Sequence, residues 1–270
     1  MKKIIAMLLV LVMAASLVAC GGEKAPETTV APETTVPAAP ETTVAPETEA
    51  PETEATVAVM SYAEFAAAEL ETEVVVETYV QTIESWWNDQ CHIYAQSEDG
   101  GYYIYGYACT EDEANALVPG TKILVKGYKT AWSGEIEIVD ATIEILEGSY
   151  IVEEAFDATA LLGTADLETY INSLVAFKGL TVAASTDANG NEVAFLYKWD
   201  GSGSQGDDIY FNVTDGTNTF TFTVNAYMID NADTYAAVEA LNVGDVIDVE
   251  GFLYWYNGAQ PHCTSIVVAE

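Results

Sequence analysis

The sequence predicts a mainly β protein in which two tandem five-stranded barrels follow a disordered stalk, each with a short helix between strands three and four. Three observations predict this fold class: a proline repeat near the N-terminus, short alternating strand patterns, and an internal duplication of those patterns. The expected boundaries are a signal peptide at 1–19, a lipidated Cys and stalk at 20–56, a first barrel with an N-terminal helix at 57–147, a helical connector at 148–172 and a second barrel at 173–270.

The N-terminus has the parts of an export signal. Lys2 and Lys3 form a positive start, and residues 4–18 are an apolar run whose single polar residue is a serine. The run is too short to span a bilayer comfortably. It ends in Leu-Val-Ala-Cys-Gly at 17–21, which resembles the lipobox of bacterial lipoproteins.

That resemblance implies that the thiol of Cys20 is acylated and that the chain is cut just before it. Two or more acyl chains, such as palmitate, anchor a protein stably where a single chain binds reversibly. We therefore expect an exported lipoprotein, anchored by lipid to the outer face of the bacterial cell membrane. The alternative is an ordinary signal peptide with a Cys near its end.

Residues 25–55 repeat the unit Ala-Pro-Glu-Thr-Thr-Val, which becomes Ala-Pro-Glu-Thr-Glu-Ala in the last copies. A proline in every unit prevents helix and central strand, and almost no side chain is suited to burial. The segment is predicted to form a stalk with polyproline-II tendency, and the whole stalk of about 36 residues would reach about 110 Å if extended at ~3.1 Å per residue. Its threonines are candidates for O-glycosylation.

The formal net charge is -35, and -30 remains once the two signal lysines and the eight Glu and one Lys of the stalk are set aside. The chain contains no arginine. Nucleic-acid binders neutralise phosphates with Lys and Arg, and so strongly negative a body repels polyanions. We therefore expect no nucleic-acid partner and a ligand that is neutral or cationic. The charge also keeps the protein soluble.

The globular part contains an internal duplication. Residues 116–128 (ALVPGTKILVKGY) align without gaps on 240–252 (ALNVGDVIDVEGF), and upstream residues 93–100 match 209–216 with the offset shortened by eight. The two matching segments occur in the same order in both copies, although the distance between them along the chain differs. This indicates two homologous domains.

Each copy reads as three strands, a helix and two strands. In the first copy the strands are expected at 73–83, 90–97, 102–109, 122–129 and 135–146; in the second, at 175–184, 208–214, 218–228, 245–255 and 263–268. Thr110-x-x-Glu113 forms a capping-box pattern that opens the first of the two helices, and the second lies between 231 and 241. The same pattern at Ser61-x-x-Glu64 predicts a helix that leads into the first barrel.

Both copies end in Leu-x-x-Gly-x-x-Ile-x-Val-x-Gly, at 117–127 and 241–251. Five strands with a helix between the third and fourth, ending in this element, resemble the OB-fold. Gly127 and Gly251 stand where a barrel strand must bend. The whole is also similar to uncharacterised surface lipoproteins of Firmicutes, a likeness that implies no established activity.

Three cysteines follow Cys20. If Asp-Gly-Gly at 99–101 is a hairpin loop, Cys91 and Cys109 lie opposite each other on neighbouring strands, which permits a disulfide; two buried free thiols are the alternative. The isolated Cys-His pairs at 91–92 and 262–263 lack zinc-site spacing. No catalytic motif occurs, so we expect a protein that is not an enzyme.

All five tryptophans fall at the predicted barrel mouths, where OB-folds bind ligands through two loops and the face between them. Rings flanked by Asp and Asn suit a sugar or a quaternary ammonium. The alternative is that the rings close the barrel ends as core. The candidate ligand-binding residues are Trp86, Trp87, Trp132, Trp199, Trp255 and Tyr256.

A long loop in the second copy places oxygens at alternating positions that suit Ca²⁺. The candidate ligands are Asp200, Ser202, Ser204, Asp207 and Asp208. The loop lacks the closing Glu of an EF-hand, since residue 211 is Phe, so a solvated loop is favoured and no cofactor is expected.

These observations predict a non-enzymatic, membrane-anchored binding lipoprotein that presents two acidic barrels to a neutral or cationic ligand such as an oligosaccharide. The alternative is a structural or interaction protein that docks other cell-surface proteins. An extracellular hydrolase and a nucleic-acid-binding OB protein are less favoured.

Overall fold

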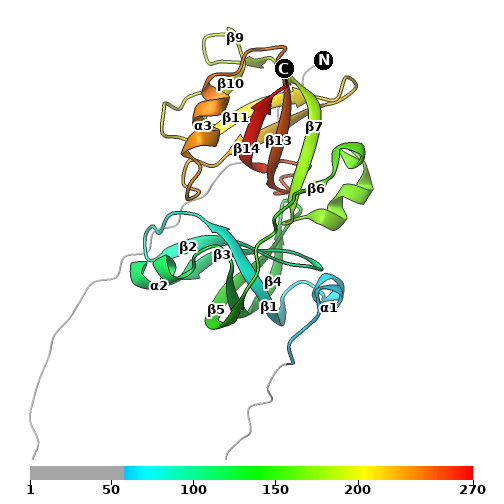
Figure 1. Cartoon of the computed structure of the whole chain (residues 1–270). Coiled ribbons are helices and arrows are strands. Elements are labelled where there is room, and N and C mark those ends of the chain that lie inside the picture. The colour runs from blue at the N-terminus through cyan, green and yellow to red at the C-terminus, as the bar shows by residue number, and fades with distance from the viewer. Residues whose placement is uncertain (1–57, 270) are drawn as a thin grey trace, which may run out of the picture. The chain divides into compact units, whose positions relative to one another are not determined.

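The computed structural model describes residues 58–269; the predicted signal peptide, Cys20 and the stalk lie outside them. Strands dominate this part of the chain, and none of its helices combines the length and apolar character needed to cross a membrane. Figure 1 shows the strands gathered into two groups, one formed by β1 to β5 and the other by strands from β7 onward.

The first group is a closed barrel with the strand order β1-β2-β3-β5-β4. All its pairs are antiparallel except β3 with β5. Its elements are α1 (Tyr62–Ala67), β1 (Thr72–Ile83), β2 (Gln90–Ser97), β3 (Gly100–Ala108), α2 (Glu111–Ala116), β4 (Thr121–Trp132) and β5 (Glu135–Ser149).

The second group repeats this topology. β7 pairs with β11, β11 with β12, β12 in parallel with β14, β14 with β13, and β13 with β7 again. Its main elements are β7 (Leu174–Ala183), β11 (Ile209–Thr214), β12 (Thr219–Val224), α3 (Ala232–Glu239), β13 (Val246–Phe252) and β14 (His262–Val268). Both barrels therefore have the OB-type order with a helix between the third and fourth strands, which confirms the predicted fold class.

Short elements fill the segments between these strands. In the connector, β6 (Phe156–Asp157) adds to β7 and is followed by two 3₁₀ helices, η1 (Thr159–Leu161) and η2 (Ala165–Tyr170). Gly163, with φ at 79°, separates these two helices, so the expected helical connector is two short pieces. The long loop of the second barrel contains β8 (Ser185–Thr186), β9 (Glu192–Val193) and β10 (Phe195–Tyr197), and the turn at Gly190 joins β8 to β9.

Both capping boxes predicted from the sequence are present. Ser61 and Glu64 exchange hydrogen bonds at the start of α1, and Thr110 and Glu113 do so at the start of α2. The local sequence therefore sets where these two short helices begin.

The two bend glycines occupy equivalent irregular positions. The β4–β5 register shifts at Gly127, and the β13–β14 register shifts at Gly251. A Cβ at Gly127 would lie 2.7 Å from the carbonyl oxygen of Val139, and one at Gly251 would lie even closer to that of His262. Close approach of two strands therefore requires glycine at both sites.

Each barrel has its own apolar core, and a third, smaller cluster joins the barrels. In that cluster the rings of Tyr94 and Phe252 stack with centroids 4.7 Å apart and planes 13° apart. The buried members of the joining cluster are Tyr94, Tyr103, Met228 and Phe252.

The hairpin between β2 and β3 is tighter than the sequence predicts. Ser97 pairs with Gly100, so the loop has two residues and β3 begins at the glycines. As a result Cys91 pairs with Tyr107, and the prediction that Cys91 and Cys109 lie directly opposite is wrong. Their sulfurs nevertheless lie 3.8 Å apart, as buried free thiols.

Candidate functional site

The face of the first barrel formed by β2 and β3 is covered by the second barrel. Tyr94 and Tyr103 project from this face and stack on each other with centroids 4.6 Å apart. Phe252 stacks on Tyr94, and Tyr254 meets Tyr103 edge-on at 5.9 Å. Because this is the face with which OB-folds contact ligands, in the first barrel it serves as a protein interface instead.

The corresponding face of the second barrel borders a cavity of about 710 Å³. We call this space the aromatic cavity because rings from both barrels line it. They come from β3, from the last residue of β4, from the long loop after β7, from β11 and from the loop before β14. The six Tyr and Trp rings are Tyr103, Trp132, Trp199, Tyr210, Tyr254 and Tyr256.

Three of these rings are open to solvent. Trp199 is 70% exposed, Trp132 53% and Tyr256 45%. The rings of Trp132 and Tyr256 lie with centroids 5.1 Å apart and planes 32° apart. Large aromatic surface that stays exposed in one cavity indicates a binding site rather than core.

Backbone contacts between the two turns position Trp132 beside Tyr256. The amide of Asn257 donates to the carbonyl of Ser133 at 2.7 Å, and Gly134 forms an isolated bridge with Tyr256. Ser133 and Asn257 both have left-handed backbone conformations, which sharpen the turns. One turn from each barrel therefore supplies one ring of the pair.

The polar groups of the aromatic cavity are mostly uncharged. Asn212 accepts a hydrogen bond from the hydroxyl of Thr221 at 2.8 Å, and Gln260 also lines the cavity. Asp208 is the carboxylate among the lining residues; it accepts from the amide of Ala226, and burial raises its pKa. The lining contains no lysine, so it has hydrogen-bonding groups for the edge of a planar ligand but no cation for a phosphate.

His262 forms part of the inner wall of this cavity. Its ring stacks on Tyr254 with centroids 4.5 Å apart, and its Nδ1 is 2.9 Å from the hydroxyl oxygen of Tyr94. Burial lowers the pKa of His262 to about 3, so the ring is neutral near pH 7. It acts as a flat packing surface and a hydrogen-bonding partner, not as a charge.

Two carboxyl groups, the half-buried Glu84 and the buried Glu135, join the barrels beside the cavity. Glu84 accepts from the hydroxyl of Tyr103 at 3.3 Å and from the side-chain amide of Asn225 at 2.8 Å. Burial, and then the charge of Asp208, raise the pKa of Glu84 to about 7.

Glu135 is the second of these carboxyls. It accepts from the backbone amide of Trp255 at 2.6 Å, and burial raises its pKa to about 9. Its other oxygen is buried without a hydrogen-bond partner, and the pKa of about 9 keeps this carboxyl protonated at neutral pH. Near pH 7 the barrel interface therefore contains one protonated carboxyl, Glu135, and one, Glu84, that is close to its pKa.

The structure brings together Trp132, Trp199 and Tyr256 of the predicted binding residues. Trp255 packs partly against the core of the second barrel and lines a neighbouring cavity of about 590 Å³. Trp86 packs against the core of the first barrel, where its indole nitrogen donates to the carbonyl of Cys109 at 2.8 Å. Trp87 is 78% exposed but does not line the aromatic cavity.

The predicted Ca²⁺ ligands do not converge. Asp200 accepts from the amide and hydroxyl of Ser202, and Asp207 accepts from the amide of Ser204, so both carboxylates stabilise local turns. Asp208 turns into the aromatic cavity instead. Within residues 58–269 no group of three or more His, Cys, Asp or Glu side chains is arranged to hold a metal ion.

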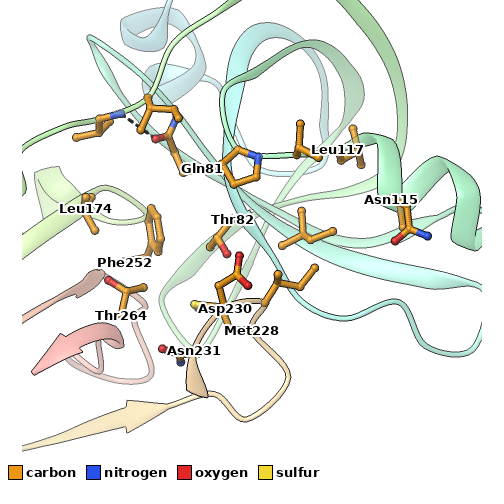
Figure 2. A pocket seen from close by; sticks show the side chains of 17 residues that line it. Gln81, Thr82, Asn115, Leu117, Leu174, Met228, Asp230, Asn231, Phe252 and Thr264 are labelled. Carbon is orange, nitrogen blue, oxygen red and sulfur yellow. Dashed lines mark hydrogen bonds between the residues drawn. The ribbon is translucent and has the colours of Figure 1, made fainter. Parts of the chain in front are cut away.

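A further cavity of about 450 Å³ lies between the barrels and is shown in Figure 2. Aliphatic side chains such as Leu117 and Met228 line much of it, and Gln81 at one side accepts from the amide of Val152 at 2.9 Å. Its aromatic side chain, Phe252, is buried in the barrel interface. It offers no exposed ring, so the aromatic cavity is the better candidate site.

The tyrosines of the aromatic cavity are not among the binding residues that the sequence predicts. Tyr103, Tyr210 and Tyr254 lie on strands or in a strand-end loop, where they read as ordinary strand formers. One signal was available: residues 91–95 have apolar or aromatic side chains on both faces of β2, which is typical of a strand covered on both sides.

No family model matches the sequence, and no curated protein matches it. Solved structures that it resembles include a murine DNA-binding protein bound to double-stranded DNA, with 12% identity, a TM-score of 0.34, and coverage of 73% of this chain and 98% of that chain. The HINa domain of Ifi202 in complex with a 20-base-pair double-stranded DNA matches at 11% identity and a TM-score of 0.32, over 74% of this chain and 96% of that chain. A deletion mutant of the single-stranded DNA binding protein from Thermus aquaticus matches at 13% identity and a TM-score of 0.22, over 73% of this chain and 94% of that chain. Likeness at this level concerns the fold and does not identify what this chain binds.

The comparisons do contradict two expectations from the sequence, the function and the partner. We expected a neutral or cationic ligand such as an oligosaccharide and no nucleic acid, whereas three of the solved structures that this chain resembles are complexes with double-stranded DNA. The exclusion of nucleic acid on the basis of net charge was wrong because net charge governs only the contacts to phosphates. Stacking of a base on an aromatic ring needs no cation, so the absence of arginine does not exclude nucleic acid.

Proposed function

We propose that this chain binds the bases of single-stranded nucleic acid by stacking them in the aromatic cavity. The observation that carries the proposal is the presence of three solvent-open rings, Trp132, Trp199 and Tyr256, in one cavity of about 710 Å³. Exposed flat rings offer a face to any base, and each stacked base contributes roughly 1–3 kcal/mol.

The polar lining suits base edges. Asn212 and Gln260 carry both a donor and an acceptor, which is the combination that the edge of a base requires. A single strand fits better than a duplex, because bases inside a duplex already have both faces stacked and are not free to meet a ring.

The charge of the protein shapes how such a strand binds. Asp208 is the charged group of the cavity lining, and the body of the protein is strongly acidic. Phosphates therefore gain nothing from contact with this surface and point to solvent. We therefore expect a modest affinity that comes from the bases and not from the phosphate backbone.

Export and lipid anchoring belong to the same proposal. The pattern at residues 1–21 supports an extracytoplasmic protein held by lipid on Cys20, one that binds without catalysis and needs no cofactor. Mass spectrometry of the mature N-terminus tests this part directly. A diacylated or triacylated first residue derived from Cys20 is expected, and a Cys20→Ser variant should leave the membrane fraction.

The binding proposal is tested by tryptophan fluorescence titration of the full chain with a six-nucleotide oligothymidine and with thymidine. We expect quenching by both, with the strand binding more tightly because it offers several bases. Trp199→Ala should weaken binding by about 5- to 100-fold, the equivalent of one lost stacking contact.

Trp87→Ala is the matched control, because Trp87 is as exposed as Trp199 but lies outside the aromatic cavity. It should leave the affinity unchanged. Equal losses in the two variants, or no binding of either probe by the folded wild type, contradict the proposal.

A further inference from the structure

Two buried thiols meet at one end of the first barrel. Cys91 lies on β2 and is 1% exposed, and Cys109 follows β3 directly and is 8% exposed. Their sulfurs are 3.8 Å apart and both thiols are free. Formation of a disulfide shortens this separation to about 2.05 Å, a movement that side-chain rotation and a small strand shift supply.

The backbone around the pair is irregular enough to make that shift. The register of β2 and β3 changes between Cys91 and Ile93, so the ladder is already interrupted beside one sulfur. Cys109 lies beyond the end of β3, where its amide donates to the carbonyl of Asp89 at 3.0 Å. Neither cysteine is thus fixed by a regular ladder on both sides.

We propose that Cys91 and Cys109 are a dithiol–disulfide couple that closes by exchange with a small-molecule disulfide. The more exposed Cys109 thiolate attacks the small disulfide, forms a mixed disulfide and releases one small thiol. Cys91 then attacks the Cys109 sulfur and releases the second. Two protein thiols become one disulfide, one small disulfide becomes two thiols, and each leaving thiolate takes up the proton that a cysteine has lost.

Closure fixes the loop that carries two tryptophans. The carbonyl of Cys109 accepts the indole N–H of Trp86, and the amide of Trp87 donates to the carbonyl of Gln90. The β1–β2 loop is therefore bonded to Cys109 and to Gln90, the residue before Cys91. Because burial raises the pKa of both thiols, exchange should be slow near pH 7 and faster at alkaline pH.

The test uses the full chain with Cys20→Ser, exposed to excess oxidised glutathione at pH 8. We expect a loss of two hydrogen atoms in the intact mass and, after cleavage at Glu98, a cross-linked pair of peptides that separates on reduction. The thermal midpoint should rise by ~5–10 °C, as expected for a closed loop of this length in a chain of this size. Trp86 emission should change at the same rate.

Three variants separate the roles. Cys91→Ser should trap glutathione on Cys109, Cys109→Ser should react slowly because Cys91 is shielded, and Cys263→Ser should close as wild type does, since Cys263 is buried in the second barrel. The proposal is overturned if the folded chain stays reduced while the urea-unfolded chain forms the cross-link. It is equally overturned if closure lowers the thermal midpoint.

Discussion

Lys129 fastens the N-terminal helix to the first barrel through a single buried ammonium group. Its Nζ donates to the carbonyls of Phe65, Ala66 and Ala68 at 3.0, 2.8 and 2.8 Å, and it lies 5.2 Å from the centre of the Phe65 ring. These carbonyls belong to the last turn and C-cap of α1, where helix carbonyls run out of partners, and only that of Phe65 also accepts from the amide of Ala68, at 3.2 Å. Burial lowers the pKa of this lysine, so its contacts oppose a cost of desolvation.

Lys129→Met should therefore destabilise the chain by about 2–3 kcal/mol, because three carbonyls lose a charged donor while the apolar stem is kept. Urea unfolding measures the difference. Lys126→Met is the control: Lys126 forms an exposed ion pair with Glu73 at 3.2 Å, which is worth little. Similar losses for the two variants would show that Lys129 does not anchor α1.

The barrel interface gives the stability a dependence on pH through Glu84 and Glu135. Their pKa values rise from 4.5 to about 7 and about 9 in the folded chain. A carboxyl with a raised folded pKa keeps its proton in the folded state above the pH at which the unfolded chain releases it. The contribution of such a carboxyl to the free energy of unfolding is complete below pH 4.5 and is lost as the pH rises through its pKa in the folded chain.

We expect the thermal midpoint to fall between pH 5 and pH 9 at constant ionic strength. Glu84→Gln should flatten the fall below about pH 7, and Glu135→Gln should flatten it up to about pH 9. Glu153→Gln, on the exposed surface, controls for the change in net charge. Curves for the two interface variants that run parallel to wild type would refute this assignment.

Residue types alone predict some of these roles and not others. The exposed rings of Trp132 and Trp199 could be proposed from loop position, but Trp86 and Trp255 lie in equivalent loops and are partly buried in cores. Loop side chains turn inward or outward according to packing that is set elsewhere in the chain. The burial of Glu135 depends on the second barrel, so the local sequence contains no sign of it.

The strand elements were the most predictable part of the molecule. The duplicated segment places β4 and β13 within a few residues of their observed bounds, because an alternating pattern with one buried face fixes the register. The β2–β3 turn was misplaced because three turn-forming residues, 99–101, follow one another. The ladder takes up both glycines and leaves Glu98 and Asp99 as the loop.

At the scale of the elements, the two bend glycines, Gly127 and Gly251, can be tested by substitution. Gly127→Ala and Gly251→Ala should each cost about 1–3 kcal/mol, because the added Cβ meets backbone atoms that cannot move aside. Gly179→Ala tests strain alone, since Gly179 has a φ of 67° with nothing near its Cβ. Urea unfolding should rank Gly251→Ala, whose contact is closest, as the most harmful. An unchanged midpoint for both bulge variants would show that the strands separate freely there.

At the scale of the whole molecule, duplication has given the two barrels different roles. The β2–β3 face of the first barrel packs against Phe252 and Tyr254, and the matching face of the second borders the aromatic cavity. Sequence similarity between the copies could not reveal this, because both carry the same strand pattern. The asymmetry arises in the interface, where the loop before β14 closes over one face and leaves the other open.

With an acidic surface and an aromatic cavity, this chain is proposed to bind nucleic acid by stacking its bases, without contacts to phosphates. The salt dependence of binding tests this binding mode most directly. The affinity of the wild-type chain for a six-nucleotide oligothymidine should stay level or rise from about 20 mM to about 500 mM NaCl, because salt screens repulsion between strand and protein. Thymidine, which has no charge, should bind equally at every salt concentration. An affinity for the strand that falls steeply with salt, as when Lys and Arg neutralise phosphates, would contradict the account.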